Sequence, residues 1–417
     1  MMGKRILFIA PASFPANSAE AIVNLKQLKL LCDNGYKIDV ISKKMKWAQY
    51  PEEQYEQTLI NLSSLHILEI DNKVSIQTVW THLLTYLSFG IVYKGAHWAY
   101  LGLTVCKQLI AKKKYDYVIT KNYPSELLGY YLKKKYNIKW VATWNDPFPH
   151  EKYPHPYGNG PMAKLSYSKR RLLKVMAKYA DIHMFPSERL RDYMLQYLDV
   201  DMKKTRIVPH IVLDETHTPN ISSKNILRIV HTGNLHSPRD PNLFLEGLML
   251  FLEKVPEARI EFTFIGVMDD GFEENVKNKY LTKYVVILDP VSYDESLEII
   301  KNYDIAMIIE APCYEGIFLP TKVSDYMQCH KHIFSISPKD GVLHDLYSED
   351  IVKYYADCTN VTSILNAIEQ MYFDFINGDI EINMAVKSEY RGCSILKHLM
   401  IYSNDIIHIF FYSVSII

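Results

Sequence analysis

The chain has 417 residues, of which 48% are hydrophobic, and its 47 Lys and Arg residues balance its 47 Asp and Glu residues. This composition excludes disordered and collagen-like proteins, and the length predicts two domains. Residues 1–222 hold 31 basic and 19 acidic residues, a net charge of +12, whereas residues 223–417 hold 16 and 28, a net charge of −12. Two interpretations remain open: the basic half faces an anionic partner (nucleic acid, anionic lipid or a phosphorylated acceptor), or the two halves attract each other across a cleft.

The six cysteines form no CxxC pair and do not group with histidines at metal-ligand spacing. The N-terminus begins with a strand-like pattern and lacks the hydrophobic stretch and cleavage site of a signal peptide. We therefore expect a cytoplasmic protein with free thiols and no bound metal.

The first half of the chain predicts alternating strands and helices. Residues 5–10 are a short apolar run typical of a buried parallel strand, and residues 19–32 place apolar side chains at helical spacing. Residues 37–42 return to a strand pattern, which completes one βαβ unit. The alternation continues with a predicted helix at 125–136 and predicted strands at 117–120, 138–143, 182–185 and 205–209.

A second alternating series follows the polar residues 214–225, which contain Pro219 and predict a linker. Its predicted strands are 227–232, 260–267, 285–288, 305–309 and 332–336, with helices at 242–252, 292–301 and 321–328. Two such series predict an α/β protein with two Rossmann-like, doubly wound domains that face each other across a cleft. We predict a first domain at 1–213, a linker at 214–225, a second domain at 226–375 and a helical, apolar tail at 376–417.

Two apolar stretches fit this pattern less well. Residues 79–105 are rich in aromatic and aliphatic side chains but contain Lys94 and two histidines, and residues 395–417 contain Asp405. Because each stretch contains polar residues in its interior, neither predicts a membrane-spanning helix. Each stretch is either buried helix or a surface that enters lipid.

In open parallel sheets, ligands bind beyond the carboxyl ends of the strands. Gly233 and Asn234 directly follow one such strand, and Arg239 comes soon after, close to the start of the next helix. Lys322 lies in the first turn of another predicted helix, where a cation opposes the helix dipole unless an anion is bound. Asp325 lies one turn later on the same side, so it could accept hydrogen bonds from ribose or simply pair with Lys322.

In the first domain, Asp146 follows the strand ending at Thr143 and can extend a carboxylate into the cleft. The loop beyond it, residues 149–161, carries His150 and predicts an acceptor lid or a plain surface loop. Residues 269–271 (Asp-Asp-Gly) predict a turn rather than a metal site. The chain has no GxGxxG sequence, which argues against a dinucleotide dehydrogenase.

With these residues in place, the second domain resembles the retaining glycosyltransferases of family four, which have the GT-B fold. The similar stretches are IVHTGNLHSPRD, FTFIGVMDDG, VVILDPVSYDESLEIIKNYDIAMII and EGIFLPTKVSDYMQCHKHIFSIS, in the expected order. The opening unit KRILFIAPASFPANSAEAIVNLKQLKLLCDNGYKIDVIS and the stretch KWVATWNDPF resemble members that assemble bacterial polysaccharides.

The resemblance implies a hexosyl-type transferase that retains anomeric configuration and needs neither a metal nor a cofactor. A nucleotide-diphosphate sugar would be the co-substrate, and a glycan or a polyprenyl-pyrophosphate-linked acceptor would receive the sugar. Independently of the resemblance, the basic charge of the first domain predicts peripheral binding to an anionic membrane surface. No nucleic acid is expected as a partner. A nucleotide-sugar 2-epimerase and a non-catalytic sugar-nucleotide-binding subunit remain alternatives.

The resemblance also assigns roles to residues. Arg239 and Lys322 would hold the donor diphosphate, and Asp325 would take the place of the glutamate that binds ribose. Glu315 would approximate the glutamate near the donor sugar, although the family spacing counted back from Asp325 ends at Ile317. The expected groups are catalytic Asp146 and Glu315; donor-binding Gly233, Asn234, Arg239, Glu315, Lys322 and Asp325; and acceptor-side Asn17, Ser18, Asp146 and His150.

Overall fold

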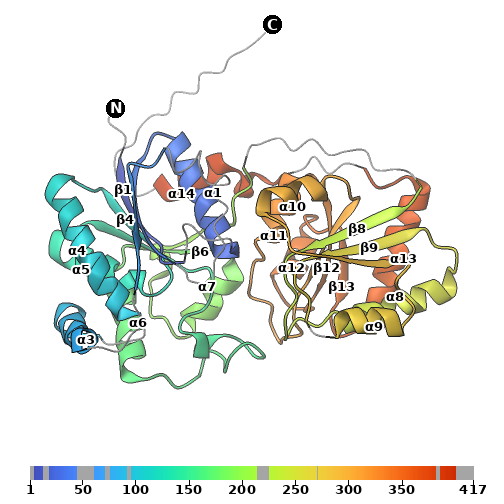
Figure 1. The fold of residues 1–417 in the computed structure, drawn as a ribbon, viewed down its shortest axis with the longest axis horizontal. Coiled ribbons are helices and arrows are strands. Elements are labelled where there is room, and N and C mark those ends of the chain that lie inside the picture. Colours follow the sequence, from blue (N-terminus) through green and yellow to red (C-terminus); the bar gives the residue numbers. More distant parts are fainter. Residues whose placement is uncertain are drawn as a thin grey trace, which may run out of the picture.

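A computed structural model describes residues 4–12, 18–44, 61–70, 76–91, 95–213, 225–269, 271–381 and 386–400. It contains two parallel sheets, one in each half of the chain (Figure 1). This confirms the predicted pair of Rossmann-like domains. Residues 214–224 of the predicted linker and residues 401–417 of the apolar tail lie outside the described residues.

The N-terminal sheet has seven strands in the order β3-β2-β1-β4-β5-β6-β7, all paired in parallel. Its strands are β1 (Arg5–Ile9), β2 (Lys37–Lys43), β3 (Ser64–Leu68), β4 (Tyr117–Lys121), β5 (Lys139–Thr143), β6 (Ile182–Phe185) and β7 (Thr205–Ile207). Its helices are α1 (Ala19–Asp33), α3 (Ile76–Phe89), α4 (Ala96–Lys112), α5 (Ser125–Tyr136), α6 (Tyr167–Tyr179) and α7 (Glu188–Leu195), with short 3-10 helices at His150–Lys152 and Met202–Lys204.

The C-terminal sheet has six parallel strands in the order β10-β9-β8-β11-β12-β13. Its strands are β8 (Leu227–Thr232), β9 (Ile260–Ile265), β10 (Val285–Leu288), β11 (Ile305–Ile309), β12 (His332–Ser337) and β13 (Tyr354–Asp357). The helices after β8 are α8 (Asn242–Lys254), α9 (Phe272–Asn278), α10 (Tyr293–Ile300), α11 (Lys322–Gln328), α12 (Val342–Ser348), α13 (Val361–Asn377) and α14 (Gly392–Met400), with a 3-10 helix at Ser388–Tyr390.

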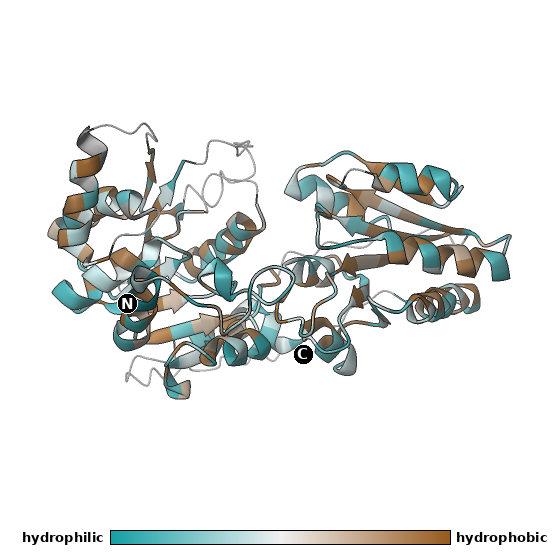
Figure 2. Cartoon of the chain, turned by 90° about the horizontal axis from the view of Figure 1, so that it is seen from below, coloured by the Kyte–Doolittle hydropathy of each residue, from teal (hydrophilic) through white to brown (hydrophobic). Residues whose placement is uncertain are grey.

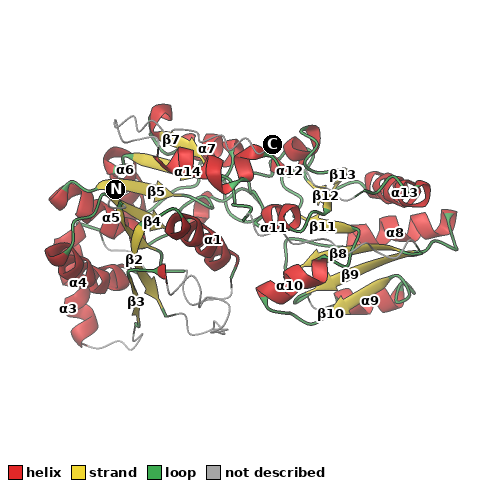
Figure 3. Cartoon of the chain, turned by 90° about the horizontal axis from the view of Figure 1, so that it is seen from above, coloured by secondary structure: helices red, strands yellow, loops and turns green. Residues whose placement is uncertain are grey.

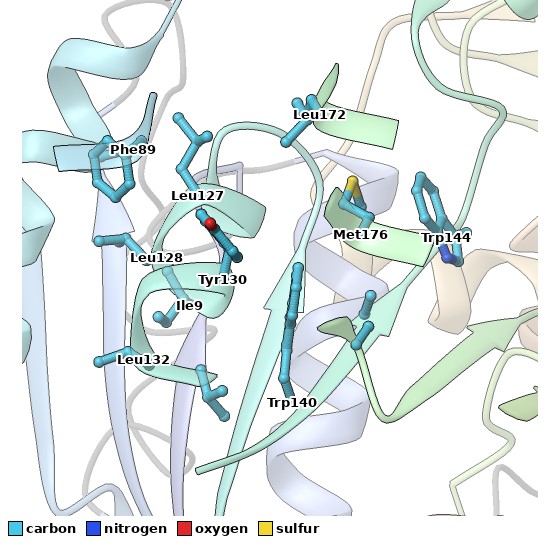
Figure 4. Close-up of a cluster of buried hydrophobic side chains, with 14 of the residues drawn as sticks. Ile9, Phe89, Leu127, Leu128, Tyr130, Leu132, Trp140, Trp144, Leu172 and Met176 are labelled. Carbon is cyan, nitrogen blue, oxygen red and sulfur yellow. The ribbon is translucent and has the colours of Figure 1, made fainter. Parts of the chain in front are cut away.

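Helices cover both faces of each sheet (Figure 3), because successive side chains of a buried strand point to opposite faces. In β1, Ile6 and Phe8 pack on the side of α1, whereas Leu7 and Ile9 pack on the side of α4 and α5. Figure 4 shows part of the second cluster, where Trp140 lies among side chains of α5 and α6. Hydropathy follows the same pattern, since the strands within both domains carry mostly hydrophobic residues (Figure 2).

The last described helix returns to the first domain. Gly392 of α14 lies against Leu30 of α1, and Leu396 joins the hydrophobic cluster beneath α1. Figure 1 shows α14 beside α1, far in sequence but adjacent in space. The chain therefore crosses between the domains twice, and its C-terminal helix helps to fix α1.

The apolar stretch at 79–105 divides into two different helices. Trp98 and Leu103 of α4 are buried in the domain core, whereas α3 exposes most of its large side chains. Neither interpretation from the sequence describes the whole stretch. No described helix combines the length and the apolar character needed to span a membrane.

Candidate active site

A cleft of about 820 Å³ lies between the carboxyl ends of the two sheets. The first domain contributes the start of α1 and the loop after β5, and the second contributes the loops after β8, β9 and β11 and the start of α11. Predicted site residues from both halves of the chain line this one cleft, namely Ser18, Asp146, Gly233, Asn234, Arg239, Lys322 and Asp325.

Lys322 is the first residue of α11 and lies in the cleft wall. Its Nζ atom lies 3.4 Å from Nε2 of His231, and it forms no ion pair with any carboxylate that the structure describes. Burial, with the charge of Arg239 as a second cause, lowers the pKa of Lys322 to about 8. Lys322 is therefore a half-buried cation that an anion in the cleft would stabilise.

His231 holds this lysine in place. Burial lowers the pKa of His231 well below its usual value, so its imidazole is neutral. Its Nδ1 atom lies 3.1 Å from the carbonyl oxygen of Met307, which only a protonated nitrogen can contact favourably. Nε2 is then an acceptor for the ammonium group of Lys322. His231 lies in a stretch used for the family resemblance, but a contact between β8 and the start of α11, 91 residues apart, leaves no local pattern in the sequence.

Gly233 leaves room for Lys322 by having no side chain. Its φ of +94° lies in the left-handed region, and a Cβ atom there would lie 3.0 Å from Cε and 3.2 Å from Nζ of Lys322. A glycine is required for both reasons. Beside it, Asn234 accepts a hydrogen bond from the backbone N–H of Val267 at 2.9 Å, which joins the loops after β8 and β9.

Arg239 lies on the same side of the cleft as Lys322 and contacts Glu310, with Nε 3.4 Å from Oε2. The carboxylate of Glu310 raises the pKa of Arg239, and Tyr157 in the same cleft adds to this effect. Glu310 directly follows β11, so its position at a strand end was a usable signal that sequence reasoning missed. It orients the guanidinium group toward the cleft.

Asp325 does not pair with Lys322, as one interpretation of the sequence allowed. Its Oδ1 atom accepts a hydrogen bond from Nζ of Lys26 at 2.6 Å and another from the hydroxyl of Tyr293 at 2.7 Å. Lys26 belongs to α1 of the other domain and is buried. Sequence reasoning missed both partners, because a pair separated by 299 residues leaves no local pattern.

Asp146 lies in the cleft in the loop after β5, near Glu20 of α1 and Tyr153. Burial raises its pKa to about 7, and the nearby charge of Glu20 adds to that effect. The preceding residue, Asn145, donates to Oε2 of Glu20 at 2.6 Å. A carboxyl group with a pKa near 7 is suited to act as a general acid or base at neutral pH.

The other acceptor-side residues differ in their placement. Ser18 caps α1 by accepting a hydrogen bond from the backbone N–H of Ala21 at 3.2 Å, and it lines the cleft. His150 is exposed, stacks on Tyr153 and is not part of the cleft lining, where Tyr153 and Tyr157 stand instead. Asn17 lies outside the described residues.

Glu315 does not line the cleft. Its carboxylate lies 3.2 Å from Nη1 of Arg189, which belongs to α7 of the first domain. Two residues later the chain enters the core of the first domain with the fully buried side chain of Ile317. This anchoring keeps Glu315 at the rim, so the structure brings Glu310, not Glu315, to Arg239.

Two further predictions concern local structure. Asp269 accepts hydrogen bonds from the backbone of Ser237 and from His236, and Gly271 has a φ of +94°, both as expected for a turn; Asp270 lies outside the described residues. Within the described residues, no group of three His, Cys, Asp or Glu side chains is placed to hold a metal ion. Thr321, which precedes α11, has a helical backbone, and its side chain makes no capping hydrogen bond.

The arrangement of two Rossmann-like domains is shared with solved glycosyltransferase structures. HepE of Anabaena, solved with UDP, is 12% identical over 95% of this chain and 98% of its own length, with a TM-score of 0.61. A glycosyltransferase of Rickettsia africae is 13% identical over 96% and 98%, with a TM-score of 0.61. The lipopolysaccharide outer core galactosyltransferase WaaB is 12% identical over 95% and 99%, with a TM-score of 0.57. A search of curated protein sequences finds no match.

The fold thus has the two-domain GT-B arrangement of these solved glycosyltransferases. Residues 26–215 match the family model described as Glycosyltransferase Family 4. This match covers the first domain, whereas most motifs that suggested the family lie after residue 226.

Proposed function

We propose that the protein transfers a hexosyl group from a nucleotide-diphosphate sugar to a glycan or lipid-linked acceptor in the assembly of a surface polysaccharide. The observation that carries this proposal is the half-buried ammonium group of Lys322, which forms no ion pair with a carboxylate among the described residues and lies in one cleft with Arg239. A diphosphate would supply the missing negative charge.

The donor side of the cleft supports transfer as well as binding. When the bond between the sugar and the diphosphate breaks, the leaving nucleoside diphosphate gains negative charge. Two fixed cations stabilise that charge more in the transition state than in the bound donor, which is what accelerates the reaction. α11 has only seven residues, so the proposal depends on these side chains rather than on the helix dipole.

The acceptor side would contain Asp146, Ser18 and the two tyrosines of the loop after β5. Asp146 would receive the proton of the attacking acceptor hydroxyl as the new glycosidic bond forms, since its pKa is about 7. We further propose that the anomeric configuration is retained, as the family resemblance implies, and that Arg239 and Lys322 act without a metal ion. The solved structures with UDP and UDP-glucose make a uridine nucleotide the first donor to test.

The test is a thermal-shift series with UDP, GDP and their sugar conjugates. A ligand that binds only the folded protein raises its free energy of unfolding, by about 2.7 kcal/mol at a hundredfold excess over Kd. The melting temperature rises as a result. We expect a shift with one of these nucleotides and its loss in Lys322→Met.

The matched control is Lys331→Met, because Lys331 is buried, with a pKa lowered to about 8 by burial, but donates to the carbonyl oxygens of Lys301 and Tyr303. This variant should melt earlier yet keep the full nucleotide shift. If neither nucleotide shifts the wild type, or if both variants lose the shift equally, the proposed donor site is wrong.

A further inference from the structure

The outer helix α3 has a surface that nothing in the described structure covers. Its sequence, IQTVWTHLLTYLSF, contains no Asp, Glu, Lys or Arg. Trp80, Leu83, Leu84 and Leu87 recur at the spacing of one helix face, and Trp80 is 61% and Leu87 70% exposed. Exposed apolar surface of this density on one short helix marks an interaction site.

α3 is attached to the domain along a narrow strip. Thr85 and Phe89, one turn apart, are buried, and the ring of Phe89 packs edge-on against Tyr131 of α5 at 6.3 Å. α3 lies at the outer end of the first domain, on the side away from the second domain (Figures 1 and 3). It therefore contributes little to the core and nothing to the cleft.

The helices around α3 carry an excess of positive charge. α4, α5 and α6 together hold ten Lys or Arg residues and one carboxylate, Glu126, which is buried. Three of these cations border α3 closely. Nζ of Lys107 and Nζ of Lys135 lie 5.8 and 5.6 Å from the ring centre of Tyr131, and Arg171 lies against Gly90 at the end of α3.

We propose that α3 lies flat in the headgroup layer of an anionic membrane, with the cations of α4, α5 and α6 against the lipid phosphates. An uncharged helix with Trp and Tyr among aliphatic residues suits the interface between water and hydrocarbon. At about 1.5 Å per residue its 14 residues span about 21 Å, too short to cross the hydrocarbon core. This proposal rests on the proposed function in one respect: the membrane would carry the lipid-linked acceptor.

Two other occupants fit the charges and the apolar helix less well. A second copy of the chain would bring two strongly basic surfaces together, and like charges oppose such a contact. Nucleic acid would attract the cations but would have to desolvate α3 without apolar contacts in return. An anionic bilayer supplies both phosphate and hydrocarbon.

The experiment is flotation of the full chain with vesicles rich in phosphatidylglycerol, compared with pure phosphatidylcholine vesicles. We expect the wild type to float with the anionic vesicles and the double variant Leu83→Glu, Leu87→Glu to bind at least tenfold more weakly. The control is Leu250→Glu, Ile376→Glu, which changes two exposed apolar residues on α8 and α13 of the other domain and should bind normally.

Depth is measured by quenching of tryptophan fluorescence with brominated lipids. Of the five tryptophans, Trp98, Trp140 and Trp144 are buried, and Trp47 lies outside the described residues. The measurement therefore uses a Trp47→Phe background, in which quenching that disappears when Trp80→Phe is added reports insertion of α3. Equal flotation of both double variants, or quenching that persists in Trp80→Phe, would overturn the proposal. So would a wild-type dimer that becomes a monomer only in the Leu83→Glu, Leu87→Glu variant. The nucleotide thermal shift, measured without lipid, should be normal in all these variants, which separates this test from that of the donor site.

Discussion

At the scale of single residues, the donor side of the cleft depends on a glycine. We predict that Gly233→Ala weakens nucleotide binding, because the new Cβ would push Lys322 aside, and lowers stability by about 1–2 kcal/mol through its left-handed backbone. Gly271→Ala is the matched control, since Gly271 has the same φ of +94° but nothing within 4 Å of its Cβ position. Both variants should lose similar stability by thermal melting, and only Gly233→Ala should raise the Kd for the nucleotide. Equal Kd values would show that Lys322 does not need this space.

Asp146 makes stability depend on pH. Because its pKa is raised to about 7 in the folded protein, the folded state holds a proton that the unfolded chain has released. The contribution of this proton to the free energy of unfolding is greatest below about pH 4 and is lost as the pH rises through about 7. Asp146→Asn removes the titration, so the stability of the variant relative to wild type should rise by roughly 2 kcal/mol between about pH 5 and about pH 8. Urea unfolding at the two pH values measures this. The exposed Asp199→Asn should show no such change, and a flat difference for Asp146→Asn would refute the raised pKa.

At the scale of elements, α1 is the part of the first domain that contacts the donor side of the second. Its buried Lys26 reaches Asp325 of α11, where the resemblance places the ribose. Removing one partner of a buried ion pair costs about 3 kcal/mol, whereas a surface pair contributes less than about 1 kcal/mol.

We therefore predict that Lys26→Met melts well below the wild type and has a larger radius of gyration by small-angle scattering, because the domains lose a contact across the cleft. Lys29→Met, on the same helix and paired at 3.7 Å with Asp33 within it, should change neither. Similar effects of the two substitutions would mean that Lys26 stabilises only its own helix.

At the scale of the whole molecule, the opposite charges of the two halves have a visible use. Contacts across the cleft pair cations of the first domain with carboxylates of the second: Lys26 with Asp325, and Arg189 with Glu315, Asp340 and Asp345. The cations of α4, α5 and α6 lie at the far end, away from these pairs (Figures 1 and 3). The ion pairs between the domains support the interpretation that the two halves attract each other across the cleft, whereas an anionic partner for the outer cations stays a prediction.

The sequence by itself determined the architecture. Apolar runs at strand length, alternating with helical spacing, were enough to predict both sheets, because a strand buried on two faces must be apolar throughout. The edge strands β3 and β13 were not predicted, because each is short and partly exposed and so lacks a continuous apolar run. Strand ends also pointed to Asp146, Gly233, Arg239 and Lys322, because in a parallel sheet those ends meet at one edge.

Only the tertiary structure decided the partners of these residues. Three contacts join elements that are distant in the sequence. Lys26 pairs with Asp325, His231 contacts Lys322, and Glu310 rather than Glu315 pairs with Arg239. The tertiary structure also decided that α3 faces outward while α4 is buried, although both are apolar. The physical reason is common to these cases: hydrophobic spacing is a local property that repeats along the chain, whereas a charge pair or an exposed face is set by how distant elements pack in three dimensions.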